Sequence, residues 1–244
     1  MWSFPPSRIL VPVDFGDASA RAVSVAAALA ARVGVRLHLL HVEAVDVPAY
    51  FTEDQVRALE HERQVARARA REFLREFGVR HGASPFTSHI DEGLPSSAIV
   101  DEAAATDLVV MGTHGRRGPA RWWMGSVAER VTRQSAAPVL VVRAGQEDVP
   151  AASVFAHPMV VAASSTDDAA SRRLATGLAD AFGGRVVAGT AACEADLAGD
   201  PAASLVVIPA AARHGVLHAH PAEHWLSRCG VPVLFMPERV SKRA

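Results

Sequence analysis

The residues best suited to chemistry in this 244-residue chain lie between Met111 and Ser126. Gly112 and Gly115 lack side chains, so a ligand can approach the backbone closely there. Gly125 and Ser126 stand where a helix is expected to begin, and the free N–H groups of a helix N-terminus favour phosphate. Positive charge is added by Arg116, Arg117 and Arg121. This stretch predicts a site for a phosphorylated ligand.

The scarcity of lysine excludes several other phosphate chemistries. The chain has one lysine, Lys242, where we expect no folded site. P-loop enzymes, protein kinases and pyridoxal phosphate enzymes each need a lysine within the site. No G-x-G-x-x-G motif follows the first predicted strand, and no G-x-x-x-x-G-K-[ST] motif occurs. A dinucleotide site of the Rossmann type and a P-loop are therefore not supported.

Alternating strands and helices must position the glycine-bearing stretch. Short apolar runs, typical of buried strands, alternate with segments of helical periodicity. The expected strands are 8–14, 35–42, 86–91, 108–111 and 138–142, and the expected helices are 17–33, 53–77, 95–105 and 126–134. This alternation favours an α/β fold with a doubly wound parallel sheet in the order 3-2-1-4-5. The stretch joins the fourth strand to a helix, where such folds bind ligands.

The spacing G-x2-G-x9-G-S, from Gly112 to Ser126, resembles the nucleotide-binding motif of the universal stress protein family. The segments 9–14, 127–131 and 137–142 add to the resemblance, which covers the first 143 residues well. It implies an ATP-binding, Rossmann-like domain over residues 1–145, with Mg²⁺ accompanying the ATP. The alternative is that the glycines make only a tight turn and the serine only caps a helix.

The resemblance also implies roles for single residues. Asp14 resembles the residue on the adenine and ribose side, and Val42 the position whose backbone contacts the adenine edge. The remaining positions are Met111, Gly112, His114 and Gly115 for the ribose and phosphate wall, and Gly125, Ser126 and Val127 for the triphosphate cradle. Arg116 is added to the site from its charge alone.

A second and shorter copy of the pattern follows residues 146–157, which we predict to be a linker. Leu178 and Gly183 each lie 149 residues after Leu29 and Gly34, and 205–208 and 232–236 echo the fourth and fifth strands. The long helix and the third strand have no counterpart, which would leave a sheet in the order 2-1-4-5. We therefore expect a degenerate, truncated universal stress protein domain over residues 158–244.

The second copy lacks the residues of the motif. Pro209 replaces Gly112 and has no N–H to offer a phosphate. The other replacements are Ala163 for Asp14, Ala212 for Gly115, and Ala219 and His220 for Gly125 and Ser126. We predict that this copy binds no nucleotide.

Histidines gather in the loop that replaces the motif. They are His214, His218, His220 and His224, with Cys229 nearby. The cluster invites a zinc hypothesis, but Pro221 interrupts the helical spacing and no cysteine pair exists. We predict no metal site, and a metal-binding adaptor stays as an alternative.

Two further patterns allow a structural and a functional interpretation. The long helix carries arginines at a spacing of four, which could form a patch that binds an anion or a partner. Because glutamates are interleaved with them, we favour a solvated helix face. The arginines are Arg63, Arg67, Arg71 and Arg75. For Trp122 and Trp123 we favour packing against the helix layer of the sheet. The alternative interpretation is a flap over the ligand or a subunit contact.

Composition limits the partners of the chain. The formal net charge is −1, so no general attraction to nucleic acid or to an anionic membrane is expected. Two cysteines give no disulfide framework. The most apolar stretch, 23–35, is too short for a membrane span, and the first residues lack the pattern of a signal peptide. We expect a cytoplasmic protein that binds neither nucleic acid nor membranes.

These observations favour a nucleotide-responsive stress or signalling module that presents a surface to an unknown protein partner. Only His114 and Asp14 are candidates for chemistry at the γ-phosphate, so we expect no fast enzyme. The alternatives are a slow ATP hydrolase and a non-nucleotide adaptor with a histidine metal site. The terminal strands of the two copies are expected to pair as an intramolecular pseudo-dimer, and a homodimer stays open.

Overall fold

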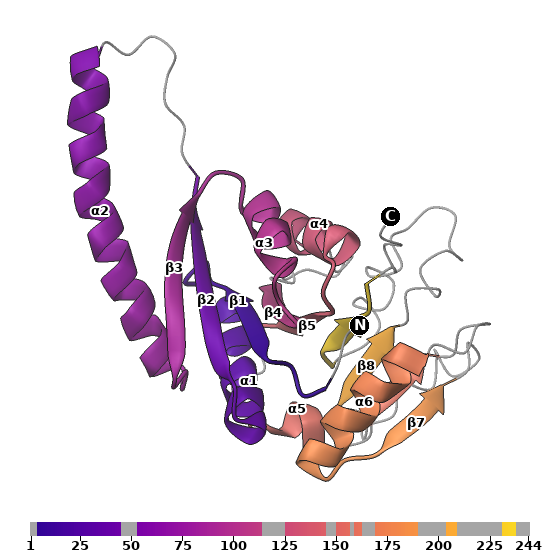
Figure 1. Cartoon of the computed structure of the whole chain (residues 1–244). Coiled ribbons are helices and arrows are strands. Elements are labelled where there is room, and N and C mark those ends of the chain that lie inside the picture. The colour runs from indigo at the N-terminus through magenta and orange to yellow at the C-terminus, as the bar shows by residue number, and fades with distance from the viewer. Residues whose placement is uncertain are drawn as a thin grey trace, which may run out of the picture.

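A computed structural model of the whole chain shows how these elements are arranged. The structure describes residues 4–44, 53–113, 125–144, 150–156, 159–162, 169–189, 204–208 and 231–237. These residues form one twisted sheet with helices packed against it (Figure 1).

The sheet of the described residues has nine strands in the order β3-β2-β1-β4-β5-β9-β8-β6-β7. The strands are β1 (Arg8–Pro12), β2 (Arg36–Glu43), β3 (Phe86–Glu92), β4 (Leu108–Thr113), β5 (Val139–Arg143), β6 (Met159–Ala162), β7 (Val186–Gly189), β8 (Leu205–Ile208) and β9 (Val233–Phe235). The first five strands are parallel and confirm the predicted order 3-2-1-4-5. β5 and β9 pair in the antiparallel sense, so the sheet continues from one half of the chain into the other.

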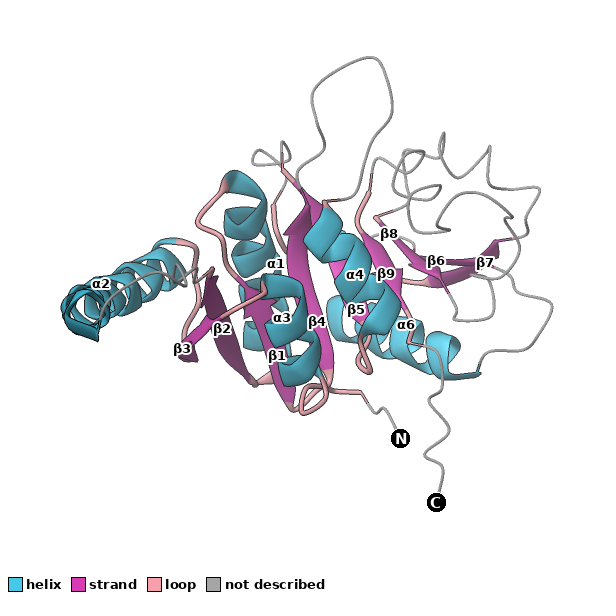
Figure 2. Ribbon diagram, turned by 90° about the horizontal axis from the view of Figure 1, so that it is seen from above, coloured by secondary structure: helices cyan, strands magenta, loops and turns pink. Residues whose placement is uncertain are grey.

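Helices cover both faces of this sheet (Figure 2). They are α1 (Asp17–Val33), α2 (Glu53–Arg80), α3 (Pro95–Ala103), α4 (Ser126–Gln134), α5 (Ser153–Ala156) and α6 (Ala169–Phe182). One core joins α1, α5, α6 and the end of α2 to one face, and the second core joins α3 and α4 to the other. Burial on both faces explains why the central strands are almost continuously apolar.

The long helix α2 differs from its expected packing. It runs to Arg80, three residues beyond the predicted end, and lies outermost beside β3 (Figures 1 and 2). The helical periodicity predicts an apolar stripe along this helix that includes Ala66, Phe73, Leu74 and Phe77. Leu74 and Phe77 are buried, whereas Phe73 is 47% exposed and Ala66 is exposed. The edge of a sheet offers a helix less surface than a face does, so among the side chains described in residues 63–80 the buried apolar ones lie in the last turns of α2.

Part of the predicted linker is structured. Residues 153–156 form the short helix α5, and Phe155 is fully buried with its ring 4.8 Å from that of Phe182 in α6. The local sequence is polar and alanine-rich, so this burial comes from a tertiary contact that composition does not indicate.

Candidate functional site

A cavity of about 290 Å³ opens at the carboxyl ends of the first strands. This is the edge of a doubly wound sheet at which ligands bind. Its described lining residues are Pro12, Val13, Asp14, Ser19, Leu40, His41, Val42, Pro95, Ile99, Met111, Gly112, Thr113, Gly125, Ser126, Val127 and Ala128. The cavity therefore brings together the residues after β1, the end of β2, the end of β4 and the first turn of α4.

The turn after β1 places Asp14 at the cavity. The backbone N–H of Val13 donates to the carbonyl of Leu40 at 2.8 Å, which holds this turn against β2. The Oδ1 atom of Asp14 accepts a hydrogen bond from the backbone N–H of Gly16 at 3.0 Å, and the residue is exposed. A carboxylate so fixed can accept hydrogen bonds from ligand hydroxyl groups.

Gly112 has a packing role that its motif spacing does not reveal. A Cβ atom there would lie 2.3 Å from the carbonyl carbon and oxygen of Ala18 and 2.7 Å from the backbone nitrogen of Ser19. The first turn of α1 therefore packs against the backbone of β4 at a distance that only glycine permits. The sequence predicted that this glycine lets a ligand approach the backbone. Gly112 also lines the cavity, so the packing role and the predicted role fall on the same residue.

The first turn of α4 supplies backbone donors to the cavity. Gly125 is the N-cap residue, and its N–H donates to the hydroxyl oxygen of Thr113 at 3.3 Å. No atom lies within 4 Å of a Cβ built on Gly125, and Ser126 beside it is exposed. Because the first N–H groups of a helix have no partner within it, this end can hold an anion.

Apart from Ser19, His41 and Thr113, the rest of the described cavity wall is apolar. Met111 is 4% exposed, and Val42 and Val127 are partly buried against the core shared with α3 and α4. An apolar wall next to a carboxylate and a helix N-terminus suits a ligand with a flat apolar part, hydroxyl groups and an anionic end.

Seven of the ten predicted site residues meet at this cavity. They are Asp14, Val42, Met111, Gly112, Gly125, Ser126 and Val127. The other three, His114, Gly115 and Arg116, lie outside the described residues, as do Trp122 and Trp123. Sequence reasoning missed His41 and Thr113. The polar residue at position 41 within an apolar strand was the available signal for His41.

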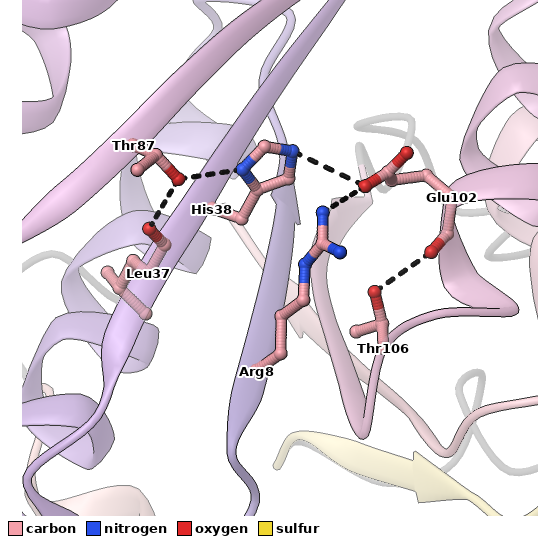
Figure 3. A network of polar contacts seen from close by, with 6 residues as sticks. All are labelled: Arg8, Leu37, His38, Thr87, Glu102 and Thr106. Atoms are coloured by element: carbon pink, nitrogen blue, oxygen red, sulfur yellow. Dashed lines mark hydrogen bonds and ion pairs between the residues drawn. The ribbon is translucent and has the colours of Figure 1, made fainter.

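A second polar cluster lies at the amino-terminal ends of the same strands (Figure 3). Glu102 of α3 pairs with the guanidinium group of Arg8, and its Oε1 atom lies 3.5 Å from Nε2 of His38. Nδ1 of His38 lies 2.8 Å from the hydroxyl oxygen of Thr87. Burial lowers the pKa of His38, Arg8 lowers it further, and Glu102 opposes both. These residues contact one another and connect three strands to one helix, so we assign the cluster a structural role.

Asp107 makes a comparable cluster at the same end. Its Oδ2 atom accepts hydrogen bonds from the backbone N–H of Ser7 at 2.7 Å, from the hydroxyl of Ser7 at 2.6 Å and from the N–H of Arg8 at 3.2 Å. Burial alone would raise the pKa of this carboxyl, but the hydrogen bonds lower it below its usual value.

The altered motif of the second copy lies outside the described residues. This holds for Ala163, Pro209, Ala212, Ala219 and the four histidines of the loop. Among the residues that are described, no group of three or more metal-ligating side chains occurs. In the same part of the chain, no helix is both long enough and apolar enough to cross a membrane.

Comparison with known proteins identifies the family. Residues 6–143 match the model of the universal stress protein family. A universal stress protein of Methanocaldococcus jannaschii is 32% identical over 143 residues, which cover 56% of this chain and 81% of that protein. One of Mycolicibacterium smegmatis is 32% identical over 137 residues, 55% of this chain and 45% of that protein. The matched region spans about half the length of this mycobacterial relative.

A solved structure extends the likeness in fold to nearly the whole chain. The crystal structure of a universal stress protein from Archaeoglobus fulgidus matches with a TM-score of 0.68 and 15% identity, covering 95% of this chain and 98% of that one. At this identity the likeness concerns the fold alone. The family match, the strand order and the motif agree, and the chain belongs to the universal stress protein family.

Proposed function

We propose that this protein binds ATP, accompanied by Mg²⁺, and acts as a nucleotide-responsive stress or signalling module. The observation that carries the proposal is the cavity, in which the Asp14 carboxylate, an apolar wall and the N-terminus of α4 line one space. The adenine would lie against Val42 and Met111, the ribose hydroxyls would donate to Asp14, and the phosphates would accept from the amides of Ser126 and Val127.

The ionisable groups of the cavity favour binding over rapid hydrolysis. Among its described lining residues, Asp14 and His41 are the only ionisable ones. Asp14 lies on the side proposed for the ribose, and the His41 ring is 2.7 Å from the carbonyl of Val13. Fast phosphoryl transfer needs a positioned base or a set of metal ligands at the γ-phosphate. The proposed output is therefore a bound-state surface offered to a protein partner.

We also propose that the C-terminal segment is a degenerate copy that forms an intramolecular pseudo-dimer with the first. In the β5–β9 ladder, Leu140 faces Leu234, while Val139 faces Phe235 and Val141 faces Val233. Aligning Pro138 with Pro232 makes Leu140 and Leu234 equivalent, so the register is self-complementary, as in a two-fold interface. The guanidinium of Arg32 donates to the carbonyl of Ala181, 149 residues away, which matches the repeat shift.

Calorimetry on ligand-stripped protein tests the nucleotide proposal. Titration with Mg-ATP is expected to give saturable heat with a dissociation constant on the order of micromolar, about −8 kcal/mol. Adenosine and inorganic triphosphate, titrated separately, each engage one part of the site and are expected to bind more weakly. Mass spectrometry of nucleotide released on denaturing freshly purified protein identifies the base. Absence of heat with every one of these ligands contradicts the proposal.

A further inference from the structure

A cluster of aromatic rings lies behind the cavity wall and reaches α2. The Phe15 ring centroid lies 4.5 Å from that of His41, 4.8 Å from Phe73 and 5.6 Å from Phe77, which it meets edge-on. Phe77 in turn lies 4.5 Å from His81. The cluster therefore joins the turn after β1, the end of β2 and the C-terminal half of α2.

Phe15 is held in an unfavourable backbone conformation. Its φ of 63° is the one positive value among the non-glycine residues that the structure describes. A bulky residue in this region costs on the order of 1–3 kcal/mol and persists only where its surroundings fix it. Phe15 directly follows Asp14 of the cavity wall, so the geometry of the carboxylate and the position of the ring depend on one turn.

His41 fixes the other side of this turn. Its Nδ1 atom lies 2.7 Å from the carbonyl oxygen of Val13. A carbonyl oxygen only accepts, so Nδ1 carries the proton and donates. Together with the bond from the Val13 N–H to Leu40, this contact holds both backbone groups of Val13 to β2. The imidazole ring also packs against Phe15, which links the cavity wall to the cluster.

The described part of α2, residues 63–80, docks through few buried contacts. Side-chain burial is described for residues 63–80 of this helix. Within that range no residue from 63 to 73 is buried, and the buried residues are Leu74, Phe77 and Gly78. Two ion pairs, from Arg63 and Arg67 to Glu92 at 2.8 Å each, lie on a partly exposed surface and add little stability. An element with so little buried apolar contact opens more readily than the core.

We infer that the cluster couples occupancy of the cavity to the docking of α2, with Phe15 and His41 as positioning residues. A ligand that engages Asp14 restrains the turn, which keeps the Phe15 ring against Phe73 and Phe77 and so favours the docked helix. By linkage, a docked helix raises ligand affinity by the same factor. This inference rests on the proposed function and assigns α2 as the element that responds to nucleotide.

Hydrogen–deuterium exchange on the full chain tests the coupling. We expect exchange of the amides of residues 63–80 to slow about five-fold or more when Mg-ATP saturates the protein. Phe15→Gly removes the ring, and glycine adopts a φ of 63° without strain, so the fold is kept. In that variant the response of α2 is expected to disappear. Phe73→Leu, which alters the cluster on α2 alone and leaves the cavity wall intact, is expected to weaken the response.

Phe182→Leu is the matched control, because it alters an aromatic pair of similar spacing with Phe155, away from α2. It is expected to respond as the unaltered chain does. Calorimetric heat with Mg-ATP and unchanged exchange in α2 would overturn the coupling while leaving the proposed function intact. A full response in Phe15→Gly would also overturn it. Absence of calorimetric heat would remove the proposed function and the coupling together.

Discussion

The two ends of the first five strands use similar polar residues for different purposes. At the amino-terminal end, Glu102 contacts both Arg8 and His38, and Asp107 is held by hydrogen bonds from Ser7 and Arg8. At the carboxyl end, carboxylate and backbone donors surround a cavity of about 290 Å³. Clustered polar residues therefore have a structural role where they form hydrogen bonds and ion pairs with one another. They indicate a binding site where their donors and acceptors line a cavity.

The largest effect is expected from Gly112→Ala at the carboxyl end. The added Cβ would lie 2.3 Å from backbone atoms of Ala18, which cannot rotate away, so α1 or β4 must shift. We expect a loss of about 1–3 kcal/mol in the free energy of unfolding, measured with urea, together with weaker Mg-ATP binding. Gly125→Ala meets no atom within 4 Å and is the matched control, with stability nearly kept. Equal stability of both variants would contradict the packing role.

Asp14→Asn is expected to separate binding from stability. Asparagine keeps an oxygen that can accept from the Gly16 N–H but loses the charge proposed to hold the ribose hydroxyls. A hydrogen bond to a charged group is worth about 1.5–3 kcal/mol, so calorimetry is expected to show roughly 10- to 100-fold weaker Mg-ATP binding.

Asp107→Asn applies the same chemical change at the opposite end of the sheet. It removes the charge that accepts from Ser7 and Arg8, so the free energy of unfolding is expected to fall while Mg-ATP affinity stays unchanged. If Asp107→Asn weakened binding as much as Asp14→Asn, the contrast between the two ends would fail.

Acid is expected to destabilise the amino-terminal end. Burial lowers the pKa of His38 below its usual value, so the unfolded chain binds this proton more readily than the folded chain. The contribution of His38 to the free energy of unfolding is therefore fully present above the pKa that this residue has in the unfolded chain. It is lost as the pH drops from about 7 towards 5. The calorimetric Tm is expected to fall further over this range in the unaltered chain than in His38→Gln, whose side chain does not titrate. An equal fall in His38→Gln would contradict this assignment.

Glu102→Gln is expected to have the smallest effect. The carboxylate is 32% exposed, and ion pairs at the surface contribute about 0–1 kcal/mol. We expect the free energy of unfolding to fall by less than about 1 kcal/mol, and Mg-ATP affinity to be the same as in the unaltered chain. Weaker nucleotide binding in this variant would show that the network takes part in the site.

The order of the first five strands could be predicted because local patterns determine each element. The helix α1 has the predicted bounds, since Gly34 adopts a φ of 74° directly after it and its N–H bonds to Ala30. The helix α5 and the partial exposure of α2 could not be predicted in this way. Phe155 is buried by contact with α6, and Phe73 is exposed because its helix lies along a sheet edge. Both depend on residues distant in sequence.

For the candidate site, spacing predicted the location better than the contribution of each residue. Gly112 and Gly125 belong to one motif, yet only the first is in close contact with another backbone. The role of Phe15 could not be predicted, because it comes from a backbone dihedral and from contacts with α2, which have no local signature. For His41 the sequence gives only a polar residue within an apolar strand, and its contact with Phe15 is visible in the structure alone.

A crystal structure of the full chain grown with Mg-ATP tests the central claim most directly. The account predicts a purine beside Val42 and Met111, ribose hydroxyls within hydrogen-bond distance of Asp14, and phosphate oxygens on the amides of Ser126 and Val127. Nucleotide bound elsewhere on the molecule, with this cavity filled only by water, would contradict it.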